Sequence, residues 1–188
     1  MNIEETLKNL GPLSTLVGTW EGDKGDDTAP SDDRGTEISR FRERIVFEPL
    51  RPVDNHEQWL YGLRYSTFAT RLGETEPFHE ELGYWLWDPA EKQVMKCFII
   101  PRGVAVNAGG LVEPDAQFFQ LSATVGSATY GICSNQFLDR EFKTVRFDLR
   151  ISFLDRNTFS YEEDTQLKVK GQDAIFHHVD RNTLKRIS

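Results

Sequence analysis

The sequence is poor in cysteine and lacks any long apolar run. Its two cysteines, Cys97 and Cys133, are too few for a disulfide framework or for a zinc site built from cysteines. No stretch approaches the ~20 apolar residues that a membrane span requires. The opening Met1-Asn2-Ile3-Glu4-Glu5 carries no signal-peptide pattern. We therefore expect a cytoplasmic protein that does not associate with a membrane.

Positive charge is also scarce. Lys and Arg number 22 against 30 Asp and Glu, which gives a formal net charge of −8 and a pI near 5.1. Nucleic acid or an anionic membrane would need a cationic face on its partner. We expect neither as a partner and expect a small molecule instead. The length of 188 residues suits a single globular domain over 1–188.

Motifs that would indicate catalysis are absent or incomplete. The segment His79-Glu80-Glu81-Leu82-Gly83 begins like a zinc-protease motif but has Gly83 where the second histidine belongs. No Gly-x-Ser-x-Gly nucleophile elbow occurs. The acidic segment 23–35 lacks the ligand spacing of a calcium-binding loop, and its near absence of apolar residues predicts a solvated loop.

Alternation of apolar and polar residues dominates what is present. Val145, Phe147, Leu149, Ile151 and Phe153 are separated by polar residues, as in an antiparallel strand with one buried face. A helical spacing occurs only at the N-terminus, where Ile3, Leu7 and Leu10 precede Gly11-Pro12 and predict a short helix. The fold class is therefore all-β with a short N-terminal helix.

Ten strands are expected, and most of the connections between them are tight. Tight links join sequential antiparallel neighbours, and about ten strands in up-and-down order close into a barrel, which removes exposed edges. A barrel of this size usually encloses a ligand cavity. A two-sheet sandwich is the alternative architecture, and an interior filled by aromatic rings is the alternative to a cavity. The expected strands are 17–22, 36–48, 57–69, 80–87, 92–100, 103–112, 116–126, 142–154, 158–169 and 173–186.

Two adjacent histidines are the most informative polar residues. His177 and His178 lie in the last expected strand, so one of them faces the barrel interior and the other faces out. Ile175 and Val179 share the parity of His177 and favour it as the inward residue, whereas Phe176 favours His178. A two-residue turn at Lys170-Gly171 would place Asp164 opposite His177, as a partner for its ring or as an ordinary exterior pair.

Four stretches of the chain resemble the nitrobindins, a family of small haem-binding β-barrels related in shape to lipocalins and fatty-acid-binding proteins. The opening Leu13-Ser14-Thr15-Leu16-Val17-Gly18-Thr19-Trp20-Glu21-Gly22 is the most specific of them. The others are Pro77-Phe78-His79-Glu80-Glu81-Leu82-Gly83-Tyr84, Ile100-Pro101-Arg102-Gly103-Val104 and His177-His178-Val179-Asp180-Arg181-Asn182-Thr183-Leu184. The resemblance implies a ten-stranded barrel with ferric haem, a histidine of the last strand on the iron and a second histidine, His79, near it.

The resemblance also implies nitric oxide or peroxynitrite chemistry at the iron. Departures from the family pattern are the acidic segment 23–35 and the last strand, where an ungapped match puts Val179 at the ligand position and one inserted residue brings His178 there. By resemblance we assign His178 as the iron ligand, with His177 and His79 as further haem-binding candidates. The predicted function is a barrel that binds an apolar or planar ligand, with haem first. A ferric-haem enzyme and a filled barrel without a ligand are the alternatives.

Overall fold

The computed structural model describes residues 2–188 and begins with two short helices. The α-helix α1 spans Ile3–Asn9, and a 3₁₀ helix, η1, spans Gly11–Leu16. The Asn2 side chain caps α1 by accepting a hydrogen bond from the Glu5 backbone N–H. The predicted N-terminal helix is confirmed. No helix within residues 2–188 is long and apolar enough to span a membrane.

Twelve strands and a second α-helix follow within residues 2–188. They are β1 (Gly18–Pro30), β2 (Thr36–Pro49), β3 (Val53–Asn55), β4 (Gln58–Arg71), β5 (His79–Asp88), β6 (Gln93–Ile100), β7 (Val104–Leu111), β8 (Phe118–Thr124), β9 (Ile132–Ser134), α2 (Gln136–Glu141), β10 (Phe142–Asp155), β11 (Thr158–Val169) and β12 (Phe176–Arg186).

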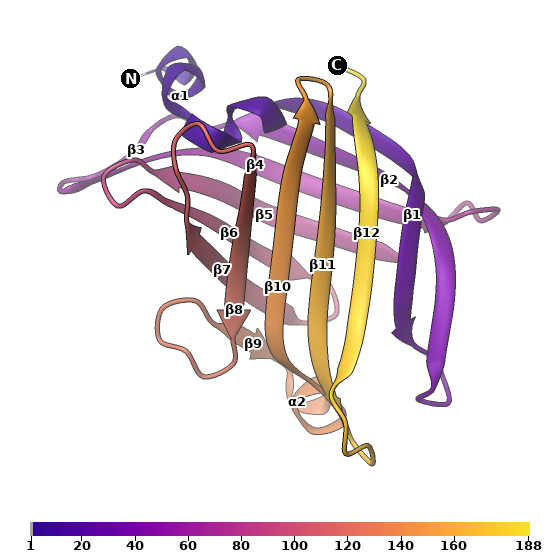
Figure 1. The fold of residues 1–188 in the computed structure, drawn as a ribbon. Coiled ribbons are helices and arrows are strands. Elements are labelled where there is room, and N and C mark those ends of the chain that lie inside the picture. Colours follow the sequence, from indigo (N-terminus) through magenta and orange to yellow (C-terminus); the bar gives the residue numbers. More distant parts are fainter. Residues whose placement is uncertain (1) are drawn as a thin grey trace.

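Ten of these strands form a closed antiparallel barrel. The sheet order is β2-β1-β12-β11-β10-β8-β7-β6-β5-β4, and pairing of β2 with β4 closes the ring (Figure 1). The short strands β3 and β9 pair with β4 and β7 outside this ring. The predicted ten-stranded barrel is confirmed, and the sandwich alternative is wrong because the closed ring leaves only one sheet.

The acidic segment corrects one prediction. Residues 23–30 are not a loop but the second half of β1, which pairs with β2 on one side and β12 on the other. The register shifts between Gly22 and Gly25, and a Cβ at Gly25 would lie 2.5 Å from the Phe41 ring. Backbone pairing on both edges therefore holds this polar segment as a strand, and only residues 31–35 form the turn. Residues 127–141 contain the short strand β9 and the helix α2.

The register of the last hairpin corrects a second prediction. The turn covers residues 170–175, and Leu167 pairs with Phe176, so Gln166 rather than Asp164 lies opposite His177. The shift from the expected register is two residues. A shift of two leaves every side chain on its predicted face, because side chains alternate with a period of two.

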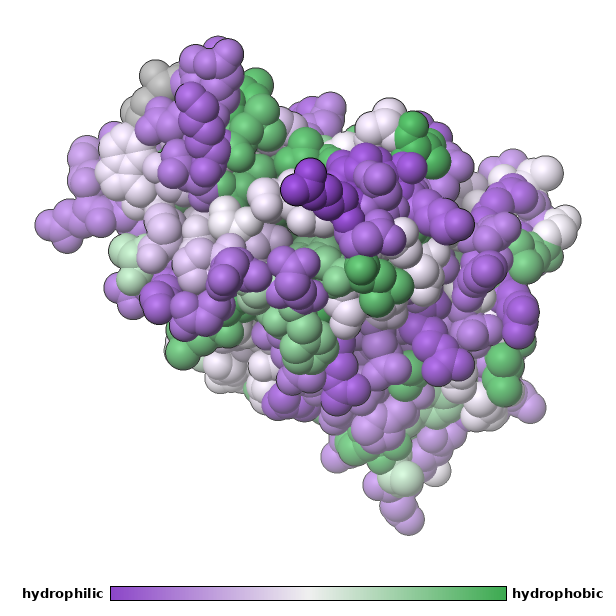
Figure 2. All heavy atoms as spheres, turned by 45° about the horizontal axis from the view of Figure 1, so that its top comes forward, coloured by the Kyte–Doolittle hydropathy of each residue, from purple (hydrophilic) through white to green (hydrophobic). Residues whose placement is uncertain are grey.

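One end of the barrel is closed by η1 and the apolar core beneath it. Leu10, Leu13 and Leu16 are almost completely buried, and the Trp20 ring packs edge-on against Phe159 at 4.8 Å. The Arg186 guanidinium lies 4.3 Å from the Trp20 ring centroid and donates to backbone carbonyls near η1. Figure 2 looks toward this end, where polar side chains cover most of the surface and apolar ones occur in scattered groups. A ligand therefore has to enter elsewhere.

Candidate functional site

The barrel encloses a cavity of about 700 Å³. It extends from Leu16, the last residue of η1, to the opposite end of the barrel, where Pro30, Pro101 and Phe137 line it. Figure 1 places α2 and the β11–β12 turn at that end. The volume lies in the range of small-molecule sites, roughly 300–1,000 Å³. The alternative of a filled interior is therefore wrong, even though many aromatic rings line the wall.

The wall is more polar than the sequence analysis anticipated. Rings of Phe41, Phe47, Phe98 and Phe147 supply apolar surface. Between them lie six charged side chains, one from each of six strands. These are Asp27, Glu43, Glu81, Lys96, Glu163 and Asp180. The cavity is also lined by Asp32, Glu37, Glu80, Arg71 and Arg102, so acidic groups outnumber basic ones.

Lys96 forms the centre of a buried ion network. Its Nζ lies 3.0 Å from Glu81 Oε1 and 2.9 Å from Glu163 Oε2, and the lysine and Glu81 side chains are only 6% and 4% exposed. The ammonium also lies 4.3 Å from the Phe98 ring centroid. Tyr65 donates its hydroxyl to Glu81. Each charge in this network is thereby compensated, which a buried charge requires.

The two carboxylates beside Lys96 respond differently to that charge. Burial opposes the ionisation of Glu81, but the charge of Lys96, the nearby imidazole of His79 and the hydrogen bond from Tyr65 outweigh it and lower the pKa of Glu81 to about 2. Burial dominates at Glu163 and raises its pKa, although Lys96 acts in the other direction. At Lys96 burial disfavours the charged form, but the negative charges of Glu163 and Glu81 outweigh burial and raise the pKa of Lys96. Glu81 is thus the permanent counterion of Lys96.

A second buried carboxylate, Glu43, is held by three donors. Tyr161 and Thr67 each donate a hydroxyl at 2.9 Å, and Asn182 donates its amide at 3.2 Å. Burial nevertheless raises the pKa of Glu43 above its usual value of 4.5. Burial, with the charges of Glu163, Glu43 and Asp27, also raises the pKa of Asp180. This part of the wall takes up protons more readily than exposed carboxylates do.

The raised pKa of Glu43 predicts how stability depends on pH. Between 4.5 and its folded pKa the folded state keeps a proton that the unfolded state releases, so the free energy of unfolding falls as pH rises. Glu43→Gln removes this contribution, and we expect a shallower fall above pH 4.5. Urea unfolding at a series of pH values measures how the free energy of unfolding of each protein changes with pH. Identical pH profiles for the wild type and the variant would contradict the assignment.

The two adjacent histidines of β12 face opposite sides of the wall. His178 lines the cavity, and its Nε2 lies 2.9 Å from Oδ1 of Asp27. The His178 side chain is 33% exposed and that of Asp27 only 5%. His178 is therefore the inward histidine, as the resemblance implied.

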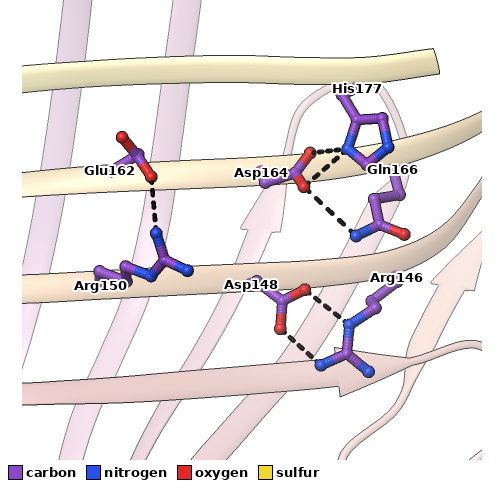
Figure 3. A network of polar contacts seen from close by, with 7 residues as sticks. All are labelled: Arg146, Asp148, Arg150, Glu162, Asp164, Gln166 and His177. Atoms are coloured by element: carbon purple, nitrogen blue, oxygen red, sulfur yellow. Dashed lines mark hydrogen bonds and ion pairs between the residues drawn. The ribbon is translucent and has the colours of Figure 1, made fainter.

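His177 lies on the outer surface. Its side chain is 56% exposed, and its Nδ1 lies 2.8 Å from Oδ2 of Asp164 (Figure 3). The same face carries the ion pairs Arg146–Asp148 and Arg150–Glu162. The prediction that His177 faces inward is wrong. Ile175 precedes β12 and says nothing about its faces, and Val179 lies on the outer face together with His177. His177 does contact Asp164, but the two residues are diagonal neighbours on β12 and β11, since Gln166 lies directly opposite His177.

His79 is the second histidine of the cavity wall. It opens β5, and its Nε2 lies 3.9 Å from Oε2 of Glu81. Burial disfavours its charged form, but the nearby carboxylate of Glu81 outweighs this and raises the pKa of His79. No group of three or more His, Cys, Asp or Glu within residues 2–188 is arranged to hold a bare metal ion. The structure thus brings His79 and His178 to one cavity and leaves His177 outside it.

The interior charges were missed, although the sequence contained a signal for them. Glu43 shares its parity with Phe41 and Ile45, and Lys96 shares its parity with Val94 and Phe98, all of which are buried. An alternation that includes one charged residue among apolar ones places that charge inside. The same pattern around Glu163 would have identified the third member of the network.

A closed barrel with a ligand-sized cavity and an inward histidine on its last strand is the architecture of a small-molecule-binding β-barrel. The chain matches the family model described as THAP4-like, heme-binding beta-barrel domain over residues 9–186. It belongs to this family, which confirms the resemblance to nitrobindin-like haem-binding barrels and makes haem the leading ligand. Curated proteins yielded no significant match.

Among solved structures, the crystal structure of Rv2717c from M. tuberculosis is similar to this chain. The TM-score is 0.68 at 21% sequence identity, and the match covers 97% of this chain and 98% of the other. At this identity the similarity establishes a shared fold.

The residues at the cavity entrance are suitable for haem. Phe78, Phe137 and Phe142 supply ring surface, and His79 and His178 supply imidazole nitrogens. Arg71 also lines the cavity, with its guanidinium 4.6 Å from the Phe78 ring, and its buried Nε has no hydrogen-bond partner among residues 2–188. A carboxylate of a bound ligand would satisfy that donor. The wall thus combines ring faces, an iron-ligating residue type and an arginine that pairs with Glu37 at 3.7 Å through one nitrogen while its Nε lacks a partner among residues 2–188.

Proposed function

We propose that this chain binds ferric haem in its cavity with His178 as the iron ligand and His79 beside the haem. The supporting observation is the position of His178, which faces the cavity from the last barrel strand. Arg71 and Arg102 line the entrance and would pair with the haem propionates. When bound, the iron would supply ligand-binding or redox chemistry set by its axial ligand, the surrounding polarity and steric access.

Haemin titration followed by absorbance tests this proposal. We expect the wild type to give a saturable Soret band with one haem per chain. Thr165→Trp, whose site lines the cavity opposite His178, should reduce haemin affinity at least about tenfold by occupying the ligand's volume. Lys168→Trp, on the exposed face of the same strand, is the matched control and should bind like the wild type. Equal binding by both variants would place haem outside the cavity.

The acidic wall bears on the alternative of a ferric-haem enzyme. Peroxynitrite is an anion, which the carboxylates around Lys96 would disfavour and which Arg71 and Arg102 at the entrance would attract. Nitric oxide is neutral and meets no such barrier. We place haem binding first, because a ferric-haem enzyme requires it as well. Faster decay of peroxynitrite with the haem-loaded chain than with the haem-free chain would support the enzyme.

Three further expectations stay proposals. We propose one domain over 1–188, a relation in shape to lipocalins and fatty-acid-binding proteins, and a cytoplasmic location with a small molecule rather than nucleic acid as the partner. Support for the location comes from Cys97 and Cys133, which are free thiols in the structure, as is usual in a reducing compartment.

A further inference from the structure

Asp27 is the contact of His178 that the sequence analysis did not anticipate. It lies in the half of β1 that was expected to be a loop, and its backbone pairs with Asp180 on β12. Its side chain is 5% exposed, and its Oδ1 lies 2.9 Å from Nε2 of His178. Ser39 is a weaker partner, with its hydroxyl 3.4 Å from the other carboxylate oxygen.

This contact determines which nitrogen of His178 is available to a ligand. An ionised carboxylate only accepts hydrogen bonds, so a hydrogen bond from His178 to such a carboxylate is donated by Nε2–H. The other ring nitrogen, Nδ1, then keeps a lone pair, which is what a metal ion requires of imidazole. A second nitrogen held by a carboxylate is also the usual arrangement around metal-ligating histidines, where it fixes the ring and strengthens it as a donor.

We propose that Asp27 is the positioning residue of His178, holding its ring so that one nitrogen is free for iron and increasing its strength as an iron ligand. This inference depends on the proposed function, since it assumes that His178 binds haem iron. A nearly fully buried carboxylate, on the strand next to β12, contacts the one histidine of that strand that faces the cavity.

The chain contains its own control for this arrangement. His177 and Asp164 form a second imidazole–carboxylate pair with almost the same separation, 2.8 Å, one residue away along β12. That pair lies on the outer surface, where Asp164 is 27% exposed (Figure 3). The two pairs share their chemistry and differ in the side of the wall they occupy. Substitutions in the outer pair therefore measure what a general loss of a carboxylate–histidine contact does.

The experiment compares Asp27→Asn with Asp164→Asn in haemin titrations. We expect Asp27→Asn to weaken haemin binding about 10–100-fold, the usual effect of losing such a partner of a metal ligand. Asp164→Asn should stay within about twofold of the wild type, because it does not contact the cavity. In the ferrous complex, resonance Raman should show a lower iron–histidine stretching frequency for Asp27→Asn, and its reduction potential should be higher. A merely structural role of Asp27 would move neither quantity.

A measurement without substitution keeps the inference testable if Asp27→Asn fails to fold. Imidazole ¹⁵N chemical shifts of the haem-free wild type at pH 8 report the tautomer of His178. A proton on Nε2 is expected, and a proton on Nδ1 overturns the inference.

The outcomes separate this inference from the proposed function. If the wild type gives no saturable Soret band, the proposed function itself fails. If the wild type binds haemin through His178 while Asp27→Asn keeps its affinity, stretching frequency and potential, haem binding stands and the role of Asp27 is refuted. Tighter binding by Asp27→Asn also refutes it, because Asp27 would then compete with iron for the same nitrogen.

Discussion

Lys96→Met should lower the free energy of unfolding by about 3–5 kcal/mol, the usual cost of removing one partner from a buried ion network. The substitution leaves Glu81 and Glu163 facing each other without their shared cation. Methionine fills a similar volume and packs well against the neighbouring rings, so lost packing contributes little. The cost therefore reports the two uncompensated carboxylates.

Urea unfolding at pH 7 measures this effect. Lys92→Met is the matched control, because Lys92 pairs with Glu113 at the same 2.9 Å distance as the Lys96–Glu163 pair but in an exposed position. We expect no change in its unfolding midpoint. Adding Glu81→Gln and Glu163→Gln to Lys96→Met should restore much of the lost stability, since no unpaired charge then remains. If Lys96→Met alone were as stable as the wild type, the ion network would be exposed to solvent.

His178→Ala should lower haemin affinity roughly 100-fold or more, because it removes the iron ligand itself rather than a partner of that ligand. His177→Ala, one residue away on the outer face, should leave affinity unchanged. Absorbance titrations with haemin compare the two. Added imidazole should restore a histidine-like spectrum to His178→Ala by occupying the space that the side chain leaves.

The reverse pattern would refute the assignment. A Soret band lost in His177→Ala and kept in His178→Ala would place haem on the outer face of β12. A band unaffected by either substitution would exclude both histidines of this strand as iron ligands and direct attention to His79.

The barrel itself was predictable because its signal is local. Phe147, Leu149, Ile151 and Phe153 alternate in the sequence and are all buried in β10. Val145 leaves this pattern because the register shifts between Thr144 and Arg146. Bulges of this kind depend on the neighbouring strand, so a single run of sequence does not reveal them.

The extension of β1 was unpredictable for a related reason. Asp27 lies among polar residues, and composition alone indicated a loop. Its strand conformation comes from backbone pairing with β2 and β12, which are distant in sequence. The orientation of His178 was accessible only in part, because Ile175 and Val179 suggested the opposite parity. Asn182 and Leu184, which are 3% and 0% exposed, continue the parity of His178 and would have corrected it.

A crystal structure of the chain with bound haemin would test the central claim most directly. We predict the porphyrin inside the cavity of about 700 Å³, with its iron bonded to a ring nitrogen of His178 and Asp27 on the other nitrogen. Haem bound on the outer surface, or iron coordinated without His178, would contradict the account.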